Sequence, residues 1–280
     1  MIKWLIPVAA SAVLMGCNSD SGGSGSGELN VSLKSPTYLI GAESRGEIDT
    51  IVADSALSIS ASDFSDVNLS RSNARSVTGM KSGISSRISE SGSSACESSG
   101  TVSYSVNGNG INDDGSFKSS GSASINLTSN NCTYDFGSGY EVENGGMSIS
   151  LSWSGYNGND SFNSIAATVL FDELSYEEYG IDDELIYSDN VDGGIKASLA
   201  NSESSVQIAL SLSSTDINNQ VITIETTTTV KQRSSDFYPY QGVVEVKGGN
   251  GTSIVYTVVA NGVEVSLNGG QPELVTWNEI

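Results

Sequence analysis

The sequence predicts an all-β protein whose antiparallel strands follow one another as a meander. Apolar and polar residues alternate over long stretches, most regularly in residues 147–153, where every odd position is apolar and every even one is serine. Such alternation is typical of a half-buried antiparallel strand. Asn-Gly and Asp-Gly pairs, which favour tight hairpins, punctuate the chain. No segment supplies the helices that parallel strands need between them.

The predicted strands have one apolar face and one face of serine and threonine. Further alternating runs are 123–127, 165–171, 206–212, 222–230, 244–246 and 254–258, and the turn pairs are Asn107-Gly108, Asp114-Gly115, Asn157-Gly158, Asn250-Gly251 and Asn261-Gly262. We expect the sheet to close partly or fully into a barrel, with a β-sandwich as the alternative.

The first residues have the pattern of an export signal. Lys3 precedes an apolar run over residues 4–15, which is shorter than the roughly 20 residues that a membrane-spanning helix needs. Its end, Leu14-Met15-Gly16-Cys17, resembles the lipobox of bacterial lipoproteins. That resemblance implies that residues 1–16 are removed and that Cys17 carries diacylglycerol and an N-acyl chain. The alternative is a secreted protein with an unmodified Cys17.

A polar stretch of Ser, Gly, Asn and Asp follows the cysteine over residues 18–27, and its composition predicts a flexible tether. In Gram-negative lipoproteins an Asp directly after the lipidated cysteine favours inner-membrane retention, and this chain has Asn18 there. We therefore expect an outer-membrane protein, anchored by its acyl chains on the periplasmic face or at the cell surface. We expect residues 28–95 to form a serine-rich N-terminal region and residues 96–280 a β-rich domain.

The charge of the chain limits its partners. Removal of residues 1–16 takes away Lys3 and no acid, which leaves 11 basic and 33 acidic residues and a formal charge of −22. Such a chain does not bind nucleic acid and is repelled by anionic lipid. We therefore expect the acyl chains on Cys17 to be the contact with the membrane, and a protein or glycan to be the further partner.

Two cysteines remain after Cys17 is set aside. Exported proteins fold in an oxidising compartment, so we expect Cys96 and Cys132 to form a disulfide. A metal site at these thiols would lack partners, because the chain contains no histidine.

The absence of histidine also excludes Ser-His-Asp and Cys-His catalysis. No Gly-x-Ser-x-Gly motif occurs, and no glycine-rich loop leads into a helix that could hold a phosphate. We therefore expect no enzyme and assign no catalytic residue. A glycoside hydrolase that uses two carboxylates is the alternative that composition leaves open.

The most unusual segment is residues 119–195, which contains 13 acids and no Lys or Arg. Its densest part, 172–192, is expected to be an acidic loop that is either solvated or neutralised by calcium. The candidate calcium ligands are Asp182, Asp183, Asp189 and Asp192. Tyr176, Tyr179 and Tyr187 lie among these acids and would suit a sugar or a cationic peptide, although tyrosine also packs on strands.

Residues 28–95 carry six of the 11 basic residues, namely Lys34, Arg45, Arg71, Arg75, Lys81 and Arg87. These cations are candidates for docking against the acidic segment within the same chain. Val77, Met80, Ile84 and Ile88 have helical spacing, although Gly79 and Gly83 each disfavour a helix by about 1 kcal/mol relative to alanine, so we expect a weak helix here that packs its apolar side chains against the open face of the sheet.

The span from Cys96 to Trp277 resembles a group of uncharacterised Gram-negative lipoproteins. The shared features are Gly100-Thr101 after the first cysteine, the pair Asn131-Cys132, and Trp277 near the C-terminus. No activity is established for this group that could be carried over to this chain. We expect a non-enzymatic, lipid-tethered β-domain that acts as a binding or structural module. The alternative function is a lipocalin-like or chaperone-like carrier, whose apolar face would form an open cavity around Ile149, Trp153 and Phe171.

Overall fold

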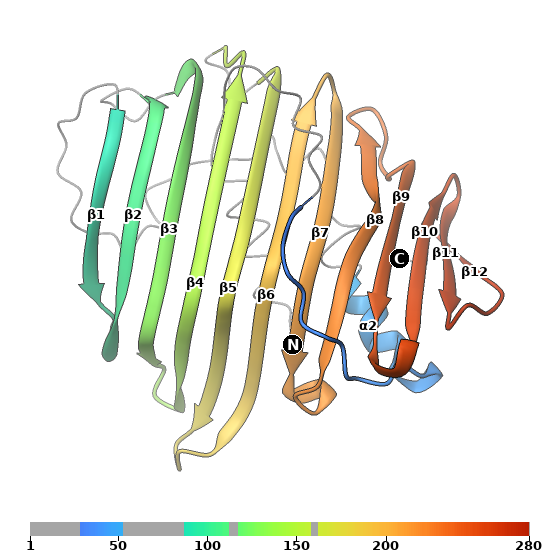
Figure 1. The fold of residues 1–280 in the computed structure, drawn as a ribbon, viewed down its shortest axis with the longest axis horizontal. Helices are drawn as coiled ribbons and strands as arrows, with labels where there is room; N and C mark the ends of the chain where they lie inside the picture. The colour runs from blue at the N-terminus through green and yellow to red at the C-terminus, as the bar shows by residue number, and fades with distance from the viewer. Residues whose placement is uncertain (1–28, 53–86, 112–116, 158–161, 280) are drawn as a thin grey trace.

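The computed structural model describes residues 29–52, 87–111, 117–157 and 162–279 (Figure 1). Cys17, the tether and most of the segment expected to form a helix around Met80 lie outside these residues. No helix in the described ranges is long and apolar enough to cross a membrane.

The described strands form one antiparallel sheet in which every strand pairs with its neighbours in sequence, as the alternation predicted. In order they are β1 (Arg87–Ala95), β2 (Ser99–Ile111), β3 (Phe117–Asp135), β4 (Gly139–Ser154), β5 (Ser164–Gly180), β6 (Leu185–Ala200), β7 (Glu203–Ser214), β8 (Val221–Arg233), β9 (Gln241–Lys247), β10 (Ser253–Val259), β11 (Gly262–Leu267) and β12 (Glu273–Thr276). Short 3-10 helices η5 (Thr215–Ile217) and η6 (Gly249–Gly251) follow β7 and β9.

One face of the sheet is apolar because the register aligns the alternating residues of successive strands. Val169 lies opposite Ile149 on one side and Ile195 on the other. Leu210 and Ile224 form a similar pair on β7 and β8. Residues directly opposite each other share a face, so these pairs make a continuous apolar surface whose side chains are buried.

The sheet is open, with β1 and β12 at its two edges (Figure 1). The expectation of closure into a barrel is therefore corrected, and the described strands form no second layer of a sandwich. Closure would require β1 and β12 to pair. They are instead separated by the full width of the sheet, and β12 has only four residues.

The N-terminal strap, defined here as residues 29–41, lies across one face of the sheet (Figure 1), and its contact with Ser211, which alternates with Leu210 and Leu212 on β7, identifies this as the serine and threonine face. The backbone N–H of Lys34 donates to Ser211 Oγ at 2.7 Å. Leu29 lies against Gly194, where an added side chain would clash with it. The strap then turns around the end of the sheet, where the N–H groups of Thr37 and Tyr38 both donate to the Val221 carbonyl.

After this turn the chain reaches the apolar face through the 3-10 helix η2 (Ala42–Ser44) and helix α2 (Arg45–Val52). Ile48 is fully buried in the core. The hydroxyl of the buried Tyr256 donates to Asp49 Oδ1 at 2.7 Å, so α2 is held by a hydrogen bond as well as by packing. The N-terminal segment therefore contacts both faces of the sheet.

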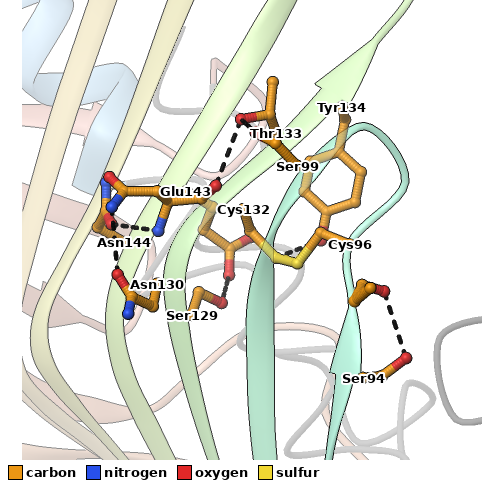
Figure 2. The surroundings of a disulfide bond; sticks show 12 residues. Ser94, Cys96, Ser99, Ser129, Asn130, Cys132, Thr133, Tyr134, Glu143 and Asn144 are labelled. Carbon is orange, nitrogen blue, oxygen red and sulfur yellow. Dashed lines mark hydrogen bonds between the residues drawn. A yellow bond between two sulfur atoms is a disulfide. The ribbon is translucent and has the colours of Figure 1, made fainter.

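A disulfide joins Cys96 and Cys132, as predicted, with their Cα atoms 5.4 Å apart. Cys96 lies in the turn between β1 and β2, and Cys132 lies in β3. The bond therefore ties the edge hairpin to the third strand. Figure 2 shows Tyr134 beside the sulfur atoms, with Ser129 donating to Glu143 nearby.

Two local predictions were wrong. Asn107-Gly108 was expected to form a turn, but both residues lie inside β2, where Gly108 permits close approach to the Ser122 carbonyl. The sheet also begins at Arg87, so residues 87–95 belong to the β-rich region and not to the N-terminal one. By contrast, Asn250-Gly251 and Asn261-Gly262 mark turns before and after β10.

Candidate functional site

Strands β3 to β6, here called the acidic half of the sheet, contain most of the basic-free segment 119–195. The acids between Phe171 and Gly193 were expected to form a loop. They lie instead mainly on β5 and β6, which are joined by a short turn. Because side chains alternate between the two faces of a strand, this acidic segment is divided over both faces.

Acids and tyrosines alternate across the strands at the hairpin end of the acidic half. Glu141 lies opposite Glu178, and Glu143 lies opposite Tyr176. Burial, and then hydrogen bonding to Glu141, raise the pKa of the Tyr176 phenol. This phenol therefore remains neutral, and the carboxylates carry the charge of this surface.

Asp189 is the most enclosed acid of this region, with 6% of its surface exposed. The Tyr187 hydroxyl donates to its Oδ2 at 2.5 Å, whereas Oδ1 has no hydrogen-bond partner. Burial raises the pKa of the Asp189 carboxyl, and hydrogen bonding with Tyr187 and Ser214 only partly opposes that shift. The carboxylate form of Asp189 is therefore a source of instability within the sheet.

The unfavourable free energy of burying the Asp189 carboxylate predicts the effect of Asp189→Asn. The native carboxyl holds its proton to higher pH than the unfolded one, so stability falls as pH rises above the ordinary aspartate pKa of about 3.9, and the loss is complete above the native pKa. We expect Asp189→Asn to be more stable than the natural chain at neutral pH, with the difference vanishing in acid. Urea unfolding across this pH range measures it.

The matched control is Asp192→Asn, because Asp192 is only half-buried and lies on the opposite face of the same strand. We expect a smaller stability change at neutral pH from this variant. The stability difference between Asp189→Asn and the natural chain should favour the variant more at pH 7 than at low pH. The opposite pH dependence would contradict a destabilising burial of the Asp189 carboxylate.

The four candidate calcium ligands are not brought together. Asp182 and Asp183 lie in the turn between β5 and β6, while Asp189 is inside β6. Asp192 is three residues further along the strand and so faces the other side of the sheet. Within the described part of the chain, no group of three His, Cys, Asp or Glu side chains has the geometry to hold a metal ion.

The predicted docking of basic residues on the acidic segment is observed for Lys34. Its Nζ lies 3.5 Å from Glu173 Oε1 and donates to Asn190 Oδ1 at 3.4 Å. Arg45 instead pairs with Asp49 and Glu273. The strap therefore places a lysine on the acidic half, which shows that this surface accommodates an ammonium group.

A groove of about 520 Å³ lies between the strap and the acidic half. Val31 and Ser32 of the strap form one wall, and Asp172 and Asp192 contribute carboxylates on the sheet side. Neither carboxylate forms an ion pair with a described residue. The groove is thus an anionic surface beside the position occupied by Lys34.

The turns at the end of the acidic half expose apolar side chains. Ile181, Leu185 and Ile186 of the β5–β6 hairpin are 77%, 48% and 52% exposed, and Phe136 of the β3–β4 hairpin is 45% exposed. The acids here stand out in the sequence, whereas these apolar residues do not, because isolated exposed apolar residues leave no periodic signal.

Comparisons of the chain with protein-family models, with curated proteins and with solved structures find no match. The described residues form a single open antiparallel sheet with an acidic half and a strap.

Proposed function

We propose that the protein is a lipid-anchored, non-enzymatic binding module of the bacterial envelope, and that the acidic half of its sheet binds a cationic partner protein. The observation that carries this proposal is the charge of residues 119–195, which contain 13 acids and no Lys or Arg. Within the described ranges, Glu173 is the acid of this segment that forms an ion pair, with Lys34.

The cost of holding so many like charges together supports binding over a purely structural role. Carboxylates on neighbouring strands repel, as Glu141 and Glu178 do when they lie opposite each other. A partner that brings lysines or arginines relieves this repulsion and is attracted over several ångströms. The Lys34 contact is an intramolecular example of the same interaction.

The alternatives have less support. Glycoside hydrolysis needs an accessible acid of raised pKa that faces a second carboxylate, whereas Asp189, whose pKa is raised by burial, is enclosed in the sheet and hydrogen-bonded to the Tyr187 hydroxyl. A carrier of hydrophobic ligands needs an accessible apolar face. The side chains of Val169 and Leu210 have no exposed surface, and Trp153 is only 1% exposed.

Binding of an oligolysine peptide to the full chain tests this proposal by calorimetry at several salt concentrations. We expect Glu141→Gln with Glu178→Gln to weaken binding about 3- to 10-fold at low salt, since each exposed charge pair contributes up to about 1 kcal/mol. Added salt should weaken the natural chain strongly, because exposed charges are screened.

The matched control is Glu264→Gln with Glu279→Gln, which removes the same charge from the C-terminal strands and tail. We expect this variant to bind within about twofold of the natural chain, because its acids lie outside the acidic half. Equal losses in both double variants would show attraction by net charge alone and would contradict the proposed site.

A further inference from the structure

The ends of two adjacent hairpins carry an exposed apolar surface, here called the hairpin-end patch, formed by Phe136, Ile181, Leu185 and Ile186. The β3–β4 and β5–β6 hairpins turn at the lower edge of the sheet in Figure 1, and the four residues lie in these turns or directly beside them. Four of the nine large apolar side chains that are exposed on the described residues belong to this patch. Leu185 and Ile186 are consecutive strand residues and so face opposite sides of β6, which places the patch around the end of the hairpin and not on one face of the sheet. The concentration of such residues at one end of the sheet is typical of an interaction surface.

The strands hold the two hairpins in fixed positions. Gly139 and Gly180 are directly paired, so the β3–β4 turn ends and the β5–β6 turn begins at the same level of the sheet. The next pair, Tyr140 and Tyr179, stacks with ring centroids 5.0 Å apart and an interplanar angle of 13°. The patch is therefore displayed on a rigid base.

Formation of the β5–β6 turn does not require these apolar residues. Its backbone is closed by the Gly180 N–H donating to the Glu184 carbonyl at 2.9 Å and the Asp183 N–H donating to the Gly180 carbonyl at 3.1 Å. The positive φ of 58° at Asp183 completes the turn. Ile181, between these residues, leaves 77% of its surface in solvent, so it contributes little to the folded core.

Acids surround the patch. Asp135, Asp182, Asp183 and Glu184 lie within the two turns or beside them, and none forms an ion pair with a described residue. An anionic lipid surface would be repelled by these charges. A protein segment with apolar side chains on one face and lysines or arginines at its border matches both features.

We propose that the hairpin-end patch is the docking surface for a basic amphipathic segment of a partner protein, whose apolar side chains cover the patch while its cations meet the surrounding acids. This inference rests on the proposed function, because it specifies where and through which chemistry the cationic partner binds.

The test uses the full chain and a designed amphipathic helical peptide of leucine and lysine, with binding measured by fluorescence anisotropy. We expect Ile181→Ser with Ile186→Ser to weaken binding about tenfold or more, because two apolar side chains no longer become buried. The matched control, Phe237→Ser with Leu274→Ser, removes two exposed apolar residues elsewhere and should leave the affinity within about twofold.

Two further probes separate the outcomes. Oligolysine without leucine should bind the natural chain and the Ile181→Ser, Ile186→Ser variant equally. Equal affinity of both chains for the amphipathic peptide would overturn the docking surface while leaving the proposed function intact. Failure of oligolysine to bind either chain would instead overturn the proposed function. Binding to phosphatidylcholine vesicles that requires Ile181 and Ile186 would show that the patch contacts lipid, and it would overturn the protein partner.

Discussion

Leu210→Ala is expected to lower the free energy of unfolding by about 3–4 kcal/mol. The Leu210 side chain has no exposed surface and lies at the centre of the apolar face, opposite Ile224 on β8 and Gly193 on β6. Truncation removes its apolar contacts and leaves a cavity, and the paired strands limit how far the surroundings can collapse. Chemical denaturation followed by tryptophan fluorescence measures the change.

Leu185→Ala is the control for this prediction, because the same truncation is made where the side chain is 48% exposed. We expect a loss of no more than about 1 kcal/mol. Comparable losses in both variants would mean that the apolar face is not the core.

Replacement of both cysteines, Cys96→Ser with Cys132→Ser, is expected to lower the unfolding free energy by about 3–4 kcal/mol. The disulfide closes a long loop in the unfolded chain and ties the β1–β2 turn to β3. Its removal therefore increases the freedom of the unfolded state and releases the edge of the sheet. Both cysteines are changed together so that no unpaired thiol complicates the result.

Reduction of the natural chain with dithiothreitol provides an independent measurement of the same bond. The reduced chain should unfold at nearly the denaturant concentration of the double variant. An unchanged midpoint in both preparations would show that pairing of β1 with β2 and β3 suffices to hold the edge.

The strands were predictable where one face alone is buried. In residues 147–153 the apolar side chains of β4 meet those of β3 and β5, so burial imposes a period of two on the sequence. Closure of the sheet was not predictable in this way. An alternating strand has the same pattern in an open sheet and in a barrel, because both bury one face.

Helix α2 could not be predicted because its stability comes from distant residues. It has only eight residues and includes Gly46, and it is held through Ile48 in the core and Asp49 on Tyr256. The separation of Asp189 from Asp192 could have been predicted. Two residues three positions apart on a strand face opposite sides, whereas the density of acids in 172–192 favours a loop, in which this rule does not hold.

The sheet has a modular construction, because strands adjacent in space are also consecutive in sequence. Loss or gain of one hairpin would change the width of such a sheet without rerouting any other strand, as a repeat does in a solenoid protein. Each strand also pairs only with the strands before and after it in the chain, which favours folding by successive addition of hairpins to those already formed. The strap is the exception, since its anchoring on β7 and β8 must wait until those strands exist.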